Sequence, residues 1–93
     1  VAGVVLRADR FGNLITNIPR TAVDEFSRGG QALTVVVGGH RVTHLVATYA
    51  EAPEGEPCAL YGSTDHLEIA VNGGSAAARL GLGAGAPVQV VRP

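Results

Sequence analysis

The stretch that decides the fold reads Asp9-Arg10-Phe11-Gly12-Asn13-Leu14-Ile15-Thr16-Asn17-Ile18-Pro19. Its second half is rich in aliphatic and β-branched residues, which favour a strand. Its first half contains aspartate, glycine and asparagine, which strands tolerate where the backbone bends or approaches a ligand closely. The stretch therefore predicts a corner that leads into a strand over residues 13–18. The polar residues of the corner break the local rule for strands, and such breaks tend to occur at functional sites.

Short strands separated by turn residues lie on both sides of this stretch. Each is a short apolar or alternating run bounded by Gly, Pro, Asn or Asp. We expect strands over residues 1–8, 13–18, 31–37, 40–48, 58–61, 66–71 and 88–92. In the run 66–71, Leu67, Ile69 and Val71 alternate with other residues and are expected to face the core. Short strands at close spacing are typical of a small barrel or sandwich, and we expect a mainly β protein with a small antiparallel β-barrel.

One or two short helices interrupt the strands. Residues 21–26 carry helix signals, with Thr21 as a candidate cap at the start and Gly29 as a stop. A second helical segment is expected over residues 75–82, because Ser75 can cap an alanine run that ends at a glycine. Residues 49–57 contain acids, two prolines and a glycine, and so predict a surface loop.

Composition bounds the possible functions. The chain has 93 residues, 46% of them hydrophobic, which is enough for one domain. Seven basic against eight acidic residues provide no basic face for nucleic acid, and no apolar run is long enough to span a membrane. A single cysteine, Cys58, cannot form an internal disulfide, which favours a reducing cytoplasm. The chain begins at Val1 within an apolar run and contains no methionine, and we therefore expect a domain of a longer protein.

Catalytic patterns are weak. His40, His44 and His66 are scattered over expected strands, and we interpret them as surface or barrel residues rather than metal ligands or bases. Ser63 has no recognisable base and orienting partner, as a nucleophilic serine requires. Cys58 lies in apolar company, which favours an inert buried thiol. These residues predict neither an enzyme active site nor a metal site.

Two polar clusters are candidates for binding. In the first, Asn13 offers both a donor and an acceptor, as an adenine edge demands, and Phe11 offers a face for stacking. The second extends from Ser63 to Gly73 and could bind an amino-acid head group and a purine edge. Its residues also fit a tight turn, a solvated Glu68 and a strand stop, and the residues alone favour that plainer interpretation because turns and sites use the same residue types.

Two motifs resemble a known family. The stretch quoted above is followed by Tyr61-Gly62-Ser63-Thr64-Asp65-His66-Leu67-Glu68-Ile69-Ala70-Val71-Asn72-Gly73-Gly74-Ser75-Ala76-Ala77. Together they resemble the C-terminal domain of the S-adenosylmethionine hydrolase (adenosine-forming) family, which also contains the fluorinase and the chlorinase. The resemblance covers nearly the whole chain.

The resemblance implies a C-terminal β-barrel over residues 1–93, whose N-terminal α/β partner domain is absent from this chain. It also implies a homotrimer in which S-adenosylmethionine (SAM), as substrate and without a further cofactor, lies between the N-terminal domain of one subunit and the barrel of its neighbour. In the hydrolases, an Asp, an Arg and a His of the N-terminal domain are thought to activate water, which attacks the ribose C5′ and releases adenosine and methionine. The chain would therefore contribute no catalytic residue and would be inactive alone.

The same resemblance implies roles for individual residues. Asn13 would bind adenine together with the backbone of Val71, Asn72 and Gly73, and Phe11 and Tyr49 would pack against the base. Asp9 and Ser63 would hold the methionine ammonium and carboxylate, with Thr64 assisting. Strand alternation turns Glu68 away from the core, toward solvent or a subunit junction, where its carboxylate would balance the positive sulfonium.

Departures from the family pattern bear on the reaction. Ile15 stands where the fluorinase has tryptophan, which favours water over halide as the nucleophile. Thr64 stands where the fluorinase has arginine, which argues against a bidentate clamp on the ligand carboxylate. Gly62 and Asp65 replace the asparagine and glycine usual at this turn. The alternatives are the C-terminal domain of a SAM-dependent halogenase, or a non-catalytic β-barrel that only drives oligomerisation. An Asn13→Ala change separates binding from mere assembly.

Overall fold

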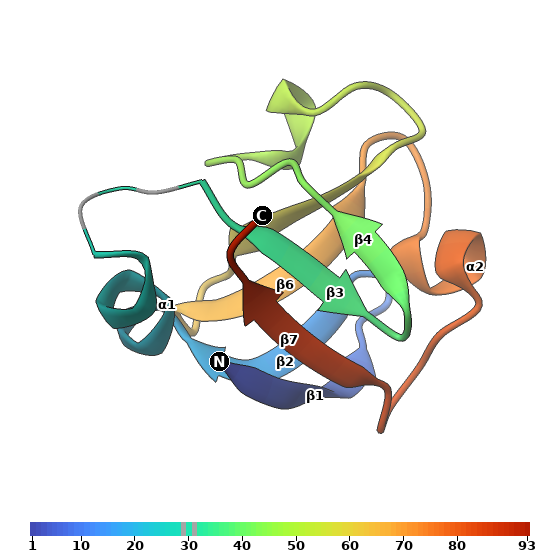
Figure 1. The fold of residues 1–93 in the computed structure, drawn as a ribbon. Coiled ribbons are helices and arrows are strands. Elements are labelled where there is room, and N and C mark those ends of the chain that lie inside the picture. Colours follow the sequence, from blue (N-terminus) through green and yellow to red (C-terminus); the bar gives the residue numbers. More distant parts are fainter. Residues whose placement is uncertain (29, 31) are drawn as a thin grey trace.

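A computed structural model describes residues 1–28, 30 and 32–93. Its strands form one sheet in the order β4-β3-β7-β1-β2-β6-β5, in which all neighbours are antiparallel. The sheet curls into a barrel (Figure 1). This confirms the expected mainly β class and antiparallel barrel. The strands are β1 (Ala2–Ala8), β2 (Leu14–Pro19), β3 (Thr34–Val37), β4 (His40–Val42), β5 (Pro57–Tyr61), β6 (His66–Val71) and β7 (Pro87–Val91).

The barrel closes between β4 and β5. The expected strand over residues 40–48 is wrong in its length, because β4 leaves the ladder with β3 after Val42. The following residues cross to β5, where the Ala59 N–H donates to the carbonyl of His44 at 2.7 Å and the Val46 N–H donates to the carbonyl of Ala59 at 2.9 Å. A parallel bridge between Leu45 and Ala59 marks this crossing. One run of residues therefore serves both edges of the sheet.

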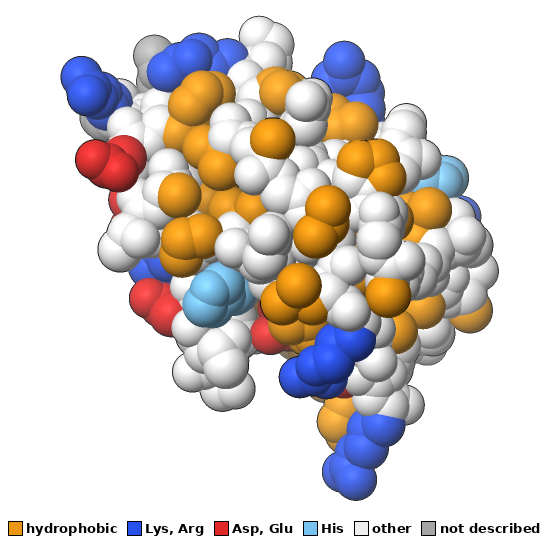
Figure 2. Space-filling model, turned by 90° about the horizontal axis from the view of Figure 1, so that it is seen from below, with side chains coloured by type: hydrophobic (Ala, Val, Ile, Leu, Met, Phe, Trp, Pro, Cys, Tyr) orange, Lys and Arg blue, Asp and Glu red, His pale blue; other side chains and the backbone are white. Residues whose placement is uncertain are grey.

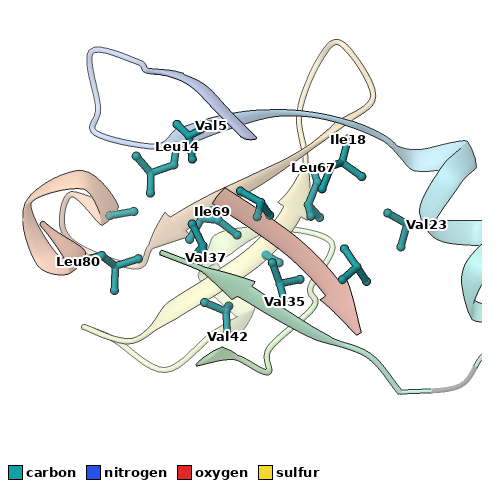
Figure 3. Packing of buried hydrophobic residues seen from close by; sticks show 14 of the residues in the cluster. Val5, Leu14, Ile18, Val23, Val35, Val37, Val42, Leu67, Ile69 and Leu80 are labelled. Carbon is teal, nitrogen blue, oxygen red and sulfur yellow. The ribbon is translucent and has the colours of Figure 1, made fainter. Parts of the chain in front are cut away.

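The core fills the barrel and extends beneath both helices (Figure 3). Leu67 and Ile69 are fully buried and Val71 is 6% exposed, which confirms the alternation expected for this strand. Burial of such side chains stabilises the fold by about 1.5–3 kcal/mol each. A smaller cluster of Ala52, Cys58 and Ala70 lies apart from the main core. Cys58 is a buried free thiol, and burial raises its pKa, as expected for an inert cysteine.

The helices are α1 (Arg20–Ser27) and α2 (Ala76–Leu80), and a 3-10 turn, η1, covers Tyr49–Glu51 within the expected loop. For α2 the expected cap is confirmed, since the Ser75 hydroxyl accepts a hydrogen bond from the Ala78 N–H at 3.1 Å. The expected cap of α1 is wrong, because the helix begins at Arg20, before Thr21, with Pro19 at the cap position. Gly29, the expected stop of α1, and Gln31, the expected start of a strand, lie outside the described residues. Within the described part of the chain, we find no helix long and apolar enough to cross a membrane.

Candidate ligand-binding site

A pocket of about 510 Å³ opens at one end of β6. It is lined by three segments of the chain that lie far apart in the sequence. These are the corner before β2, the 3-10 turn η1, and the residues where β6 ends. The lining residues are Phe11, Asn13, Tyr49, Val71, Asn72, Gly73 and Gly74. Six of the ten predicted site residues thus share one pocket.

The corner of residues 9–13 is held by its own hydrogen bonds. The Asp9 Oδ1 accepts from the Phe11 N–H at 2.9 Å and from the Asn13 N–H at 3.0 Å. The Asp9 N–H donates to the Asn13 carbonyl at 2.9 Å. Gly12 has a φ of 84°, and a Cβ built on it would lie 1.9 Å from the Ser75 hydroxyl oxygen. Only glycine fits there, and the corner therefore presents Phe11 and Asn13 on a rigid frame.

Asn13 is the polar centre of the pocket. Its backbone groups are paired within the corner, but the side-chain amide has no hydrogen-bond partner among the described residues. A half-buried amide keeps one donor group and one acceptor available for a ligand. Phe11 is 65% exposed and Tyr49 is 52% exposed, so two largely exposed aromatic side chains line the pocket with this amide. The Arg10 guanidinium lies 4.8 Å from the centroid of the Phe11 ring.

The opposite wall is backbone. The Asn72 amide donates to the Ala52 carbonyl at 2.9 Å, and the Asn72 carbonyl accepts from the Gly55 N–H at 2.9 Å. These bonds fasten the residues after η1 to the end of β6. Beyond the β5–β6 ladder, which ends with the pair of Pro57 and Val71, no hydrogen bond of the described residues uses the N–H of Gly73. This donor, on a glycine at φ 81°, therefore remains for a ligand.

Beyond the pocket, a row of outward side chains crosses four strands. The strand register brings Arg7, Ile15, Glu68 and Leu60 side by side on β1, β2, β6 and β5. Burial raises the pKa of Glu68 first, and the nearby Asp9 carboxylate raises it further, while Arg7 opposes both effects. The Glu68 carboxylate rests on Gly62, where a Cβ would meet its oxygen. Asp9 and Glu68 thus bring two carboxylates close together beside the corner that lines the pocket, with the positive charge of Arg7 also near Glu68.

Ser63 and Thr64 are not pocket residues. They are exposed in the turn between β5 and β6, at the far end of β6 from Val71. A strand of this length spans about 20 Å. Along β6, the order is therefore the pocket, then Glu68 with Asp9, then the two hydroxyls. A ligand that touches all of them is long and has a different group at each end.

Sequence reasoning missed some members of the site. Gly74 lines the pocket and directly follows the predicted Gly73. Arg7 and Leu60 belong to the outward row, which only the strand register reveals. The histidines lie elsewhere: His44 pairs with Glu56 at 3.0 Å, His66 contacts the Thr64 carbonyl, and His40 is exposed. No group of side chains in the described residues could hold a metal ion.

Comparison with known proteins assigns the family. The family model for the SAM hydroxide adenosyltransferase C-terminal domain matches residues 3–89. This chain is a member of that family. The match includes the whole pocket, the row through Glu68 and the turn at Ser63 and Thr64.

Relatives of this SAM hydroxide adenosyltransferase domain are longer proteins. The (R)-S-adenosyl-L-methionine hydrolase of Thermus thermophilus is 47% identical over 89 residues, which are 96% of this chain and 31% of the relative. A solved structure of a conserved hypothetical protein, also from Thermus thermophilus, superposes with a TM-score of 0.78 at 44% identity, over 97% of this chain and 34% of the other. An uncharacterised conserved protein from Thermotoga maritima gives 0.82 at 29% identity, over 96% and 35%. The chain thus spans about a third of the length of these relatives.

Proposed function

We propose that this chain is the substrate-binding C-terminal domain of a SAM hydrolase, an enzyme that uses water to cleave SAM to adenosine and L-methionine. Two findings support the proposal: the chain belongs to the SAM hydroxide adenosyltransferase family, and a relative at 47% identity is named as a SAM hydrolase. The observation that carries it is the unpaired Asn13 amide, which lines a pocket together with the Gly73 N–H and two aromatic rings.

The pocket binds the adenine. An adenine edge places an acceptor nitrogen beside a donor amino group, and the Asn13 amide complements both. The Gly73 N–H, within the backbone of Val71, Asn72 and Gly73, binds a second edge of the base. Phe11 and Tyr49 stack on the ring, at about 1–3 kcal/mol per aromatic contact. Because the corner is already rigid, little side-chain or backbone entropy is lost on binding.

The carboxylates of Asp9 and Glu68 bind the amino-acid portion of SAM. SAM carries two positive groups, a sulfonium and an ammonium. The Asp9 carboxylate holds the corner that lines the pocket, and the Glu68 carboxylate lies near enough to Asp9 to be affected by its charge. One oxygen of Asp9 is engaged in the corner, and its second oxygen has no partner among the described residues. Ser63 and Thr64 offer hydroxyls to the ligand carboxylate at the far end. Adenosine lacks the sulfonium, the ammonium and the carboxylate of SAM, so these side chains favour the substrate SAM over the product adenosine.

The reaction itself takes place on groups outside this chain. Water attacks the ribose C5′, a C–O bond forms, the C–S bond breaks, and methionine leaves with the electron pair of that bond. The proton of the water passes to a base on an N-terminal domain. This chain supplies binding and orientation, without a metal ion or a further cofactor. Orientation of the reacting groups alone lowers a barrier substantially.

We also propose that the complete enzyme has two domains and forms a homotrimer in the cytoplasm. The face seen from below the barrel carries many hydrophobic side chains (Figure 2), and Val4 and Leu6 of β1 are 38% and 54% exposed. Apolar area of this kind favours association with a neighbouring domain or subunit. Sedimentation of the complete enzyme should give a trimer, and a stable monomer would contradict this assembly. The single buried thiol Cys58 fits a reducing compartment.

A titration of the complete enzyme with SAM and with adenosine tests the proposed function. We expect both to bind, and we expect SAM to be converted to equal amounts of adenosine and methionine. Fluoride or chloride in the buffer should yield no halogenated nucleoside. A protein that binds neither compound would refute the proposal, and a halogenated product would assign the chain to a halogenase instead.

A further inference from the structure

We propose that Arg20 is a positioning residue that presets the turn of residues 62–65, and with it the Ser63 and Thr64 hydroxyls, for the amino-acid end of the ligand. The inference rests on the proposed function and deepens it. Arg20 itself touches no part of the pocket. It acts on the ligand only through the turn that carries the two hydroxyls.

Arg20 holds one residue of this turn by two separate bonds. Its backbone N–H donates to the Asp65 carbonyl at 2.9 Å. Its side-chain Nε donates to the Asp65 Oδ1 at 2.6 Å. The guanidinium also lies 4.1 Å from the centroid of the Tyr61 ring, which packs against the core. Arg20 thus connects the start of α1 to both ends of the turn.

Asp65 is the residue that most needs this support. Its φ of 61° places it in the left-handed region, where no other non-glycine position of the described residues lies. Aspartate adopts this conformation more readily than most residues, but it still resists it more than glycine does. The turn is closed by the Asp65 N–H, which donates to the Gly62 carbonyl at 2.9 Å. On the other side the Glu68 carboxylate packs on Gly62.

Stability alone does not account for the pair. The side chains of Arg20 and Asp65 are 45% and 60% exposed, and ion pairs this exposed add little to the free energy of unfolding. The Arg20 backbone bond already satisfies the first N–H of α1, whichever side chain follows. The Arg20 side chain fixes the position of the Asp65 carboxylate. Through Asp65 it also fixes the orientation of the Ser63 and Thr64 hydroxyls. Small errors in such orientation cost binding and rate.

The test compares Arg20→Ala with Arg28→Ala in the complete enzyme, because both changes remove an exposed arginine from the ends of α1. Arg20→Ala should raise the KM for SAM by about three- to tenfold, the range expected when one hydrogen-bonding group is misplaced. The inhibition constant of adenosine, which contacts only the pocket, should stay within about twofold of the wild-type value. Arg20→Lys keeps a charge near Asp65 and should recover part of the loss. Arg28→Ala should change none of these values.

A double-mutant cycle with Asp65→Gly makes the test sharper. Glycine accepts the positive φ but cannot bind the Arg20 side chain, so the double variant should be no worse for SAM than the poorer single variant. Independently of any ligand, Arg20→Ala should speed hydrogen exchange in a peptide that covers residues 61–66. An unchanged KM and unchanged exchange in Arg20→Ala would overturn the inference while the wild type still cleaves SAM. A wild type that binds neither SAM nor adenosine would instead refute the proposed function.

Discussion

Asn13 has one role in the fold, through its backbone, and another in the proposed binding site, through its side chain. Its backbone closes the corner of residues 9–13, so its position follows from the fold. Its side-chain amide is half buried, lines the pocket and has no partner among the described residues. A polar group that is partly removed from water without a partner costs free energy, which a complementary ligand recovers. This residue therefore reports most directly on adenine recognition.

Asn13→Ala should weaken the binding of adenosine and of SAM alike, by about 1–3 kcal/mol, because a ligand donor and acceptor lose their partners. Calorimetric titration of the complete enzyme measures this change. Asn17→Ala is the matched control, since Asn17 lies in β2, directly after the corner, and its side chain accepts from the Val4 N–H, away from the pocket. Equal affinities for wild type and Asn13→Ala would show that the pocket does not bind the base.

Glu68 gives a pH-dependent prediction. Burial and then the Asp9 carboxylate raise its pKa above the ordinary 4.5, so the folded state holds this proton more tightly than the unfolded state does. The Glu68 contribution to the free energy of unfolding therefore falls as the pH rises above 4.5. Glu68→Gln removes the charge. Its melting temperature at pH 7 should equal or exceed that of the wild type, and any gain should shrink toward pH 4.

The same change should act oppositely on the ligand. Without the carboxylate, the affinity for SAM, which carries a sulfonium and an ammonium, should fall, while the affinity for neutral adenosine should stay the same. A Glu68→Gln variant that is less stable than the wild type at pH 7 would contradict the assigned burial. A Glu68→Gln variant that binds SAM as tightly as the wild type would show that Glu68 takes no part in SAM binding.

At the scale of helices and strands, the sequence predicted the features that depend on contacts between residues close together in the chain. The cap of α2 was predictable because Ser75 bonds its own helix, and Gly81, at φ 69°, ends the same helix. The start of α1 was not, because its first N–H bonds to Asp65, a residue far along the chain. The end of β4 was missed for the same reason, since residues 44–46 pair with β5. No local pattern encodes such partners.

The candidate site divides in a similar way. Phe11, Asn13 and Gly73 were recognisable because their residue types are unusual at the ends of strands. The resemblance to the family added Tyr49, which no pattern around it marks. The distance between the pocket and the turn with Ser63 and Thr64 required the strand register. The unpaired state of the Asn13 amide required the complete set of contacts.

The contact between the corner and α2 allows a test by glycine substitution. Gly12→Ala should destabilise the protein by about 1–3 kcal/mol or more, because it adds a strained φ and a Cβ that collides with Ser75. Gly39→Ala is the control, with a similar φ of 87° and no atom within 4 Å of the added Cβ. Thermal unfolding compares the two. Equal losses would mean that the close packing of the corner on α2 contributes nothing.

At the scale of the whole molecule, the chain is a barrel that presents a pocket and, near it, the carboxylates of Asp9 and Glu68. Its family membership and its relatives, which are about three times as long, agree with a domain that works beside another one. We propose that this chain recognises the ligand, that a partner domain carries out the bond-breaking step, and that the assembly cleaves SAM with water.

Product analysis in water enriched in oxygen-18 tests this claim most directly. The complete enzyme is incubated with SAM, and the nucleoside product is examined by mass spectrometry. We expect adenosine that carries oxygen-18 at its 5′ position, formed in equal amount with unlabelled L-methionine. Adenosine without the label, or SAM that remains intact in the presence of the folded enzyme, would contradict it.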